Sequence, residues 1–138
     1  MTTVSLRQKF PVPAQMIWST IGGFNTLPDW HPAIEKSDIT KDDKGTVRTL
    51  HLVGGGTIVE RLETVDEKER LYTYSILEGP LPVANYKATI RVLDDNGGCT
   101  VEWSSDFEAS GVPESDASKV IRGIYEAGFE NLKKMFGG

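Results

Sequence analysis

Cysteine is nearly absent from this sequence, which has Cys99 alone and therefore can form no internal disulfide. Chains with so little cysteine are typical of reducing compartments, because small secreted domains usually depend on several disulfides. The first residues, Met1 to Val4, also lack the basic segment and the apolar segment of a secretory signal peptide. We therefore expect a cytoplasmic protein.

Long apolar runs and blocks of basic residues are missing as well. No stretch approaches the ~20 consecutive apolar residues that span a bilayer. The net charge is −5, from 15 Lys and Arg against 20 Asp and Glu. Binding to nucleic acids or to anionic membranes depends on clustered Lys and Arg. We predict no nucleic-acid partner and no membrane insertion, which leaves apolar or amphipathic small molecules as the open class of partner.

The side-chain sets that hold metals and nucleotide cofactors are not found either. The two histidines, His31 and His51, do not have the spacing of a metal site, and no cysteine or carboxylate cluster joins them. Cys99 lies beside a predicted hairpin turn, and no serine lies in a nucleophile elbow. The glycines at 54–56 are not followed by a helix with the residues of a phosphate-binding loop. We predict no metal site and no cofactor.

What is present is typical of an ordinary globular chain. The sequence has 138 residues, of which 38% are hydrophobic and 25% are charged. This length is sufficient for one domain with a substantial core. No repeat or linker divides the chain, so we predict a single ligand-binding domain over residues 1–138.

The last two dozen residues, 113–136, have the clearest helical period. We place Pro113 in the first turn, where its missing N–H costs nothing, and Gly137 at the end of the helix. Acidic residues near the start and basic residues near the end suit the helix dipole. Such a helix spans roughly 35 Å. Its predicted apolar stripe consists of Ala117, Val120, Ile121, Ile124, Gly128, Leu132 and Met135, with Tyr125, Phe129 and Phe136 along one edge.

The rest of the chain is predicted to be mostly strands joined by short turns. Such a series predicts an antiparallel sheet with one helix-covered face. The predicted fold is α+β: a curved antiparallel sheet of about seven strands wrapped around the long C-terminal helix, with two short helices after the first strand. The predicted segments are strands at 3–10, 34–40, 46–53, 57–66, 70–78, 85–94 and 99–109, a helix at 14–21, and a second short helical turn within 24–32.

Four stretches resemble a known family. They are Phe24 through Trp30-His31-Pro32, Gly55 to Leu62, Tyr74-Ser75-Ile76 leading to Gly79 through Tyr86, and Val101-Glu102-Trp103 with Phe107. Together with the long helix they resemble the helix-grip fold of the START-like, birch-pollen-allergen superfamily (SRPBCC), and most narrowly its bacterial polyketide cyclase/dehydrase-like branch. The resemblance implies a deep, mainly apolar cavity between sheet and helix that holds a lipid, polyketide, steroid or similar ligand. Members include carriers, hormone receptors, cyclases and chaperone-ATPase activators, so the fold alone does not choose a function.

Trp30-His31-Pro32 is the most conspicuous polar and aromatic cluster. Trp30 could form a wall of the cavity mouth, and His31 could bind a ligand or exchange a proton near neutral pH. The structural alternative is a tryptophan that simply closes one end of the barrel.

Three predicted strands alternate in a way that brings polar aromatic groups to one face. If these faces point inward, Tyr74, Tyr86, Trp103 and Ser105 carry hydroxyl groups and an indole N–H into an apolar space. Mostly apolar walls with a few polar groups are typical of a small-molecule pocket. The alternative is that these residues only pack the core, with each hydroxyl bound by the backbone. We favour a pocket, largely because of the family resemblance.

Glu60 shares its strand parity with Ile58 and Leu62. If that parity faces inward, the carboxylate needs a partner, or its pKa rises on burial. It could then act as a general base or anchor a ligand hydroxyl. We favour the alternative of a structural ion pair with Arg48 or Arg61.

Gly128 lies near the middle of the helical stripe, although glycine in a helix interior costs about 1 kcal/mol relative to alanine. Either a strand or Trp103 approaches closely at this point, or the glycine leaves room for a ligand.

We therefore predict a carrier or sensor that binds a hydrophobic or amphipathic small molecule, such as a lipid, polyketide or aromatic compound, as a monomer or homodimer. The first alternative is a cyclase or dehydratase that uses His31 or Glu60 for proton transfer. The second is a protein-partner or chaperone-type module that uses the outer sheet face. The predicted ligand-binding residues are Trp30, His31, Leu50, Glu60, Tyr74, Ile76, Tyr86, Ala88, Trp103, Ser105, Ile121, Ile124, Tyr125 and Gly128.

Overall fold

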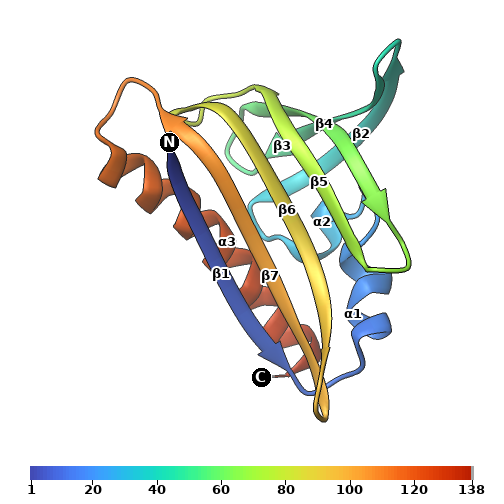
Figure 1. Cartoon of the computed structure of the whole chain (residues 1–138). Helices are drawn as coiled ribbons and strands as arrows, with labels where there is room; N and C mark the ends of the chain where they lie inside the picture. Colours follow the sequence, from blue (N-terminus) through green and yellow to red (C-terminus); the bar gives the residue numbers. More distant parts are fainter. Residues whose placement is uncertain (138) are drawn as a thin grey trace.

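A computed structural model describes residues 1–137, in which one seven-stranded sheet curls around a long helix (Figure 1). The predicted α+β helix-grip fold is confirmed, including the two short helices after the first strand. The last residue of the predicted domain, Gly138, lies outside the described residues. The elements are β1 (Thr2–Phe10), α1 (Ala14–Ile21), α2 (Leu27–Trp30), β2 (Ile34–Asp42), β3 (Gly45–Leu52), β4 (Thr57–Asp66), β5 (Leu71–Glu78), β6 (Val83–Asp95), β7 (Gly98–Ala109) and α3 (Glu114–Phe136).

All strand pairs are antiparallel, in the order β1-β7-β6-β5-β4-β3-β2. Strands β2 to β6 each pair with the next strand along the chain, whereas β1 pairs with β7. This last pairing places the first strand beside the last strand, and α3 runs beside β1 across the inner face of the sheet (Figure 1). No helix among residues 1–137 is long and apolar enough to cross a membrane.

Most strand boundaries differ from the prediction by one or two residues, and two of these differences lie at single left-handed residues. Strand β5 begins at Leu71 rather than at residue 70, since Arg70 has a φ of 53° and ends the preceding turn. Strand β6 begins at Val83 rather than at residue 85. The pairing of β6 with β7 is irregular between Ala84 and Lys87, where Asn85 also has a φ of 53°. The irregularity accommodates Asn85, so that β6 pairs with β7 on both sides of it. The strand therefore begins two residues earlier than predicted.

The buried face of α3 is rotated from the predicted stripe toward its aromatic edge. The predicted stripe residues Val120 and Met135 are 40% and 46% exposed. Tyr125 and Phe129 are buried instead, because both rings pack on Trp103, with centroid distances of 4.2 and 6.2 Å. Large aromatic rings bury more area than Val or Met, so they determine which face points inward.

The start of α3 also differs from the prediction. Pro113 does not lie in the first helical turn but is the N-cap residue, with an extended backbone (φ −62°, ψ 154°). The proline ring therefore restricts the backbone φ of the residue before the helix, and not that of a residue in the first helical turn.

The predicted inward faces of the central strands are confirmed. Side chains of one parity are buried on β5, β6 and β7 and form the core with α3. They include Tyr72 and Tyr74 on β5, Tyr86, Ala88, Ile90 and Val92 on β6, and Val101, Trp103, Ser105 and Phe107 on β7. Because strand side chains alternate, every hydroxyl on these faces is carried into the interior.

Candidate ligand-binding cavity

A small cavity of about 40 Å³ lies between the inner sheet face, α2 and α3. Its walls are mostly apolar, with one ion pair, three tyrosines, one histidine and one tryptophan among them. The lining side chains that the sequence predicted are His31, Leu50, Glu60, Tyr74, Ile76, Tyr86, Trp103, Ile121, Ile124 and Tyr125.

Four predicted ligand-binding residues lie outside this lining. They are Trp30, Ala88, Ser105 and Gly128. Trp30 is buried and packs on Trp103, at a centroid distance of 5.4 Å. Ala88 and Ser105 are cross-strand neighbours within the sheet core. For these positions the structure supports the alternative of core packing.

The space predicted beside Gly128 is filled by aromatic rings. A methyl group at this position would lie 2.9 Å from Trp30 Cζ3, 3.0 Å from His31 Cδ2 and 3.1 Å from Trp103 Cζ3. Such distances are shorter than ordinary van der Waals contact, so Gly128 is required for the close approach of these three residues to α3. The structure thus supports close approach over room for a ligand.

Sequence reasoning did not place five residues in the cavity wall. Of these, Ile58 shares the parity of Glu60 on β4, and Arg48 was considered only as an ion-pair partner, so strand alternation could have found both. Leu27 begins the short helix α2, Ile34 begins β2, and Leu81 lies in the β5–β6 connection; at these positions no period indicates the direction of a side chain. The five are Leu27, Ile34, Arg48, Ile58 and Leu81.

Arg48 and Glu60 form the predicted ion pair inside the sheet. Arg48 Nε and Nη2 lie 2.8 and 2.6 Å from Glu60 Oε1, and Arg48 Nη1 donates to the Phe24 carbonyl oxygen at 2.7 Å. The guanidinium also lies 4.1 Å from the centre of the Phe24 ring. Burial raises the pKa of the Glu60 carboxyl group, and the charge of Arg48 opposes this rise. The other candidate partner, Arg61, points outward to Asp42.

Three tyrosine hydroxyl groups and one indole N–H form a row along the cavity wall. Trp103 Nε1–H donates to the Tyr74 hydroxyl at 3.0 Å. The Tyr74 and Tyr86 hydroxyl oxygens lie 3.4 Å apart, and the Tyr86 hydroxyl contacts that of Tyr125. Burial raises the pKa values of Tyr74 and Tyr86 well above 10, so these hydroxyls keep their protons and remain hydrogen-bond donors.

His31, which directly follows α2, contacts α3 through one ring nitrogen and its own loop through the other. Nε2 lies 2.8 Å from the Ile124 carbonyl oxygen, to which it donates, and Nδ1 accepts the Ala33 N–H at 3.2 Å. Because a carbonyl only accepts and an amide N–H only donates, this arrangement selects the neutral imidazole. Burial lowers the pKa of His31, although the bond to Ile124 opposes this. Both nitrogens are engaged, so His31 is poorly placed to exchange protons with a ligand.

Comparison with known proteins agrees with the fold. The family described as polyketide cyclase / dehydrase and lipid transport matches residues 1–137. The protein belongs to this family.

Solved structures of bacterial proteins are similar along almost the whole chain. The protein XoxI from Bacillus cereus has a TM-score of 0.93 and 40% identity, covering 99% of this chain and 96% of XoxI. An uncharacterised protein from Bacillus thuringiensis has a TM-score of 0.92 and 39% identity, covering 98% of each chain.

Two plant proteins are more distant relatives in sequence. MLP-like protein 423 from Arabidopsis thaliana is 29% identical over 131 residues, which is 87% of this chain and 84% of that protein. The abscisic acid receptor PYL2 from the same plant is 26% identical over 95 residues, or 65% of this chain. The matched region is only 50% of the receptor's length.

In this member of the polyketide cyclase / dehydrase and lipid transport family, a surface hollow of about 360 Å³ adjoins the cavity at the β5–β6 connection. Ile76, Leu81 and Tyr86 line both spaces and therefore separate them. The hollow also includes Leu77 and Val83. Ile76 and Leu81 make this boundary largely apolar.

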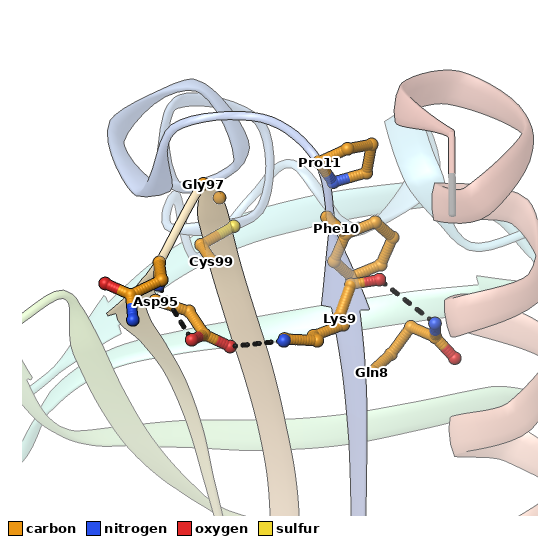
Figure 2. Close-up of a pocket in the computed structure, with 9 residues that line it drawn as sticks. Gln8, Lys9, Phe10, Pro11, Asp95, Gly97 and Cys99 are labelled. Carbon is orange, nitrogen blue, oxygen red and sulfur yellow. Dashed lines mark hydrogen bonds and ion pairs between the residues drawn. The ribbon is translucent and has the colours of Figure 1, made fainter.

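A second hollow, of about 370 Å³, lies at the opposite end of the sheet beside the β6–β7 hairpin (Figure 2). Figure 2 shows the ion pair between Lys9 and Asp95, and Cys99 is another of the lining residues. None of the predicted site residues lines it. Among residues 1–137, no group of three or more His, Cys, Asp or Glu side chains is placed to hold a metal ion.

Proposed function

We propose that this protein is a carrier or sensor that binds one amphipathic small molecule, such as a lipid, a polyketide or an aromatic compound, between the sheet and α3. The observation that carries the proposal is the buried Arg48–Glu60 pair beside the tyrosine hydroxyl groups, in a cavity whose other walls are mostly apolar. Such walls with a few fixed polar groups are typical of small-molecule sites. We also propose a cytoplasmic location, in keeping with the free, buried Cys99.

The comparisons support this class of function. The family description includes lipid transport, and two relatives are named as receptors for a small molecule, abscisic acid. A buried ion pair seldom stabilises a fold more than apolar residues of similar volume would. Its position in the cavity wall therefore favours a role in binding.

The cavity is too small for a whole ligand, so we infer that binding requires a movement of its wall. About 40 Å³ is far less than the roughly 300–1,000 Å³ of typical ligand pockets. The adjoining hollow of about 360 Å³ supplies the missing volume once Leu81 moves aside. Leu81 lies between Pro80 and Pro82 in the connection from β5 to β6, so a shift of this short segment joins the two spaces.

Native mass spectrometry of the protein from its own host tests the proposal. We expect an added mass that is released on denaturation. Leu81→Trp narrows the passage and should reduce the bound fraction. Val65→Trp is the matched control, because Val65 is an exposed apolar residue on β4 that lines neither the cavity nor the hollow. A wild-type protein without any added mass, which also fails to bind amphipathic probes, contradicts the proposal.

A cyclase or dehydratase is the second candidate, and the position of Glu60 favours it over a mechanism through His31. A carboxylate with a raised pKa lies in the same cavity wall as tyrosine donors, which could polarise a carbonyl group while the carboxylate removes a proton. In this case Glu60→Gln should abolish turnover of the co-purified compound while binding persists. For a carrier, the compound stays chemically unchanged on incubation with the wild-type protein.

A further inference from the structure

Strand β2 is an open border of the sheet. The opposite border, β1, lies beside α3, whereas β2 pairs with β3 on one side and has no strand on the other (Figure 1). Among residues 1–137, the backbone of residues 36–42 forms hydrogen bonds with β3 alone. The backbone N–H and C=O groups that point away from β3 are therefore free to pair with a further strand.

The regular part of β2 has an exposed apolar residue at its centre. The register of β2 on β3 shifts between Ile34 and Lys36 and is then regular from Lys36 to Asp42. Ile39 is the middle residue of this segment and is 38% exposed. It lies opposite Arg48, which is buried, so Ile39 belongs to the inner face of the sheet. The apolar side of the sheet thus continues to its open border.

A second copy of this chain offers an identical β2, and strand geometry limits how the two can pair. Directly opposite residues of an antiparallel pair either both point their backbone groups toward the partner or both point them away. Because this direction alternates along a strand, the numbers of opposite residues in two copies of β2 differ by an even amount. The two-fold axis then passes beside one residue, which lies opposite its own copy. An axis at Ile39 pairs the whole regular segment with itself.

The charges on β2 fit an axis at Ile39. Each Lys36 then lies opposite Asp42 of the second copy, and both side chains are exposed. Asp38 lies opposite Thr40, which can donate a hydrogen bond to it. Within each chain Asp38 already pairs with Lys36, and Asp42 pairs with an arginine, so the association leaves neither carboxylate without a cation. Opposite charges across a strand pair stabilise it.

Other two-fold registers of β2 fit less well. An axis at Asp38 places the two Asp38 carboxylates opposite each other. An axis at Thr40 places Asp38 opposite Asp42, twice in each dimer. Like charges directly opposite each other destabilise a strand pair. An axis at Ser37 would have to pair residues across the irregularity at the start of β2.

Lysine on an edge strand commonly prevents such pairing, and β2 has two lysines. With the axis at Ile39, Lys36 lies opposite a carboxylate. Lys41 lies opposite Ser37, whose hydroxyl group can accept a hydrogen bond from the ammonium group. Neither lysine therefore lies opposite another cation or an apolar side chain, and the usual reason for exclusion does not apply.

We propose that β2 is a self-association site, at which a second copy of this chain adds its own β2 in antiparallel, two-fold register with Ile39 opposite Ile39. The pairing joins the two sheets into one continuous sheet. A single strand pair buries less than the ~1,200 Å² typical of stable complexes, so the dimer is reversible. The site is independent of the proposed carrier function, because no residue of 36–42 lines the cavity.

Sedimentation equilibrium of the wild-type protein is the first test. We expect the average mass to rise toward that of a dimer as the concentration increases from about 0.01 to about 1 mM, the range in which a small interface associates. A mass that stays monomeric throughout this range overturns the proposal. An absent ligand would contradict the carrier function and leave this result unchanged.

Reversal of one charge at a time tests the register. Lys36→Asp and Asp42→Lys each create two like-charge pairs in their own dimer, so each should weaken association by about ten-fold. In an equimolar mixture of the two variants, the heterodimer regains two opposite-charge pairs, and association should return to about the wild-type level. Lys134→Asp, on the exposed side of α3, is the matched control and should have no effect. A mixture that associates no better than its separate components overturns the proposal.

A disulfide test does not depend on Asp42, whose side chain also contacts Arg61 and the turn after β2. In Ile39→Cys the two Cα atoms lie about 4.5–5.5 Å apart across the axis, within the range that a disulfide bridges. Lys41→Cys is the control on the same face, because its two copies lie four positions apart along the ladder, or about 13 Å. The native Cys99 is buried.

Both cysteine variants are incubated with oxidised glutathione, and the covalent dimer is measured by mass spectrometry. We expect Ile39→Cys to cross-link at least several-fold more than Lys41→Cys, although Lys41 is also exposed. Equal cross-linking of the two variants, or more in Lys41→Cys, overturns the proposed register and with it the site.

Discussion

Arg48 on β3 lies directly opposite Glu60 on β4, with Nη2 2.6 Å from Oε1 and both side chains buried. Neither charge is solvated by bulk water, so each depends on the other. The pair lies between the Phe24 ring and the tyrosine row of the cavity. This relationship connects the stability of the sheet to the chemistry of the candidate site.

Removal of one partner of this pair should be strongly destabilising. We expect Arg48→Met to lower the free energy of unfolding by about 3–5 kcal/mol, because it leaves the buried Glu60 carboxylate without a counter-charge. Urea unfolding measures the change. The double variant Arg48→Met with Glu60→Leu should regain most of the loss. Lys133→Met, which removes an exposed helical pair with Glu130, should have little effect. If Arg48→Met also had only a small effect on the free energy of unfolding, the buried Glu60 carboxylate would not depend on the charge of Arg48.

Gly128→Ala should destabilise the protein although alanine is the better helix former. The added methyl group would meet three aromatic rings at 2.9–3.1 Å, so we expect a loss of about 1–3 kcal/mol in the free energy of unfolding. Gly123→Ala in the same helix is the control. It has no neighbouring atom within 4 Å and should stabilise by up to about 1 kcal/mol. If both substitutions stabilised the protein, the three rings beside Gly128 would be able to move aside at little cost in free energy.

Two tyrosines on β5 should respond differently to loss of their hydroxyl groups. Tyr74→Phe removes the acceptor of the Trp103 indole N–H and should cost about 1–3 kcal/mol in the free energy of unfolding. Tyr72→Phe removes a buried hydroxyl without a hydrogen-bond partner among residues 1–137, so its effect should be near zero. The NMR signal of the Trp103 indole N–H should shift in the first variant and stay in place in the second. Equal destabilisation would argue against a specific role for the Trp103–Tyr74 bond.

His31 should make the protein less stable at mildly acidic pH. Burial lowers the pKa of His31 in the folded state below its ordinary value of 6.5. Below about pH 6.5 the unfolded chain therefore takes up a proton that the folded chain does not, and stability falls until the folded pKa is passed. Above pH 6.5 the contribution of neutral His31 is fully present.

Urea unfolding of the wild type and of His31→Gln, at about pH 5.5 and about pH 7.5, measures this effect. Glutamine can keep both hydrogen bonds without titrating. The raised pKa of Glu60 shifts stability in the opposite direction, so the difference between the two proteins is the quantity to follow. A difference that does not change with pH would mean that His31 has no lowered pKa.

The sequence alone was sufficient for the fold and for which residues share one face of a strand. Side chains alternate with a period of two in any strand, so the order of residues grouped Glu60, Tyr74, Tyr86 and Trp103 with their neighbours of the same parity, and the structure showed that these faces point inward. The helical period and the terminal charges similarly located α3 and most of its buried side chains. These are local properties of the chain, and they persist whatever packs against them.

Only the tertiary structure decided which neighbours these residues have. The register of β3 on β4 placed Arg48 directly opposite Glu60. The packing of Trp103 on Tyr125 rotated α3, and the approach of rings to Gly128 closed the space that the sequence left open for a ligand. Leu81 lies in the cavity wall, although it belongs to a connection in which the sequence has no periodic pattern of apolar residues. Register, ring packing and cavity volume depend on contacts between distant segments, and a local pattern carries no information about those contacts.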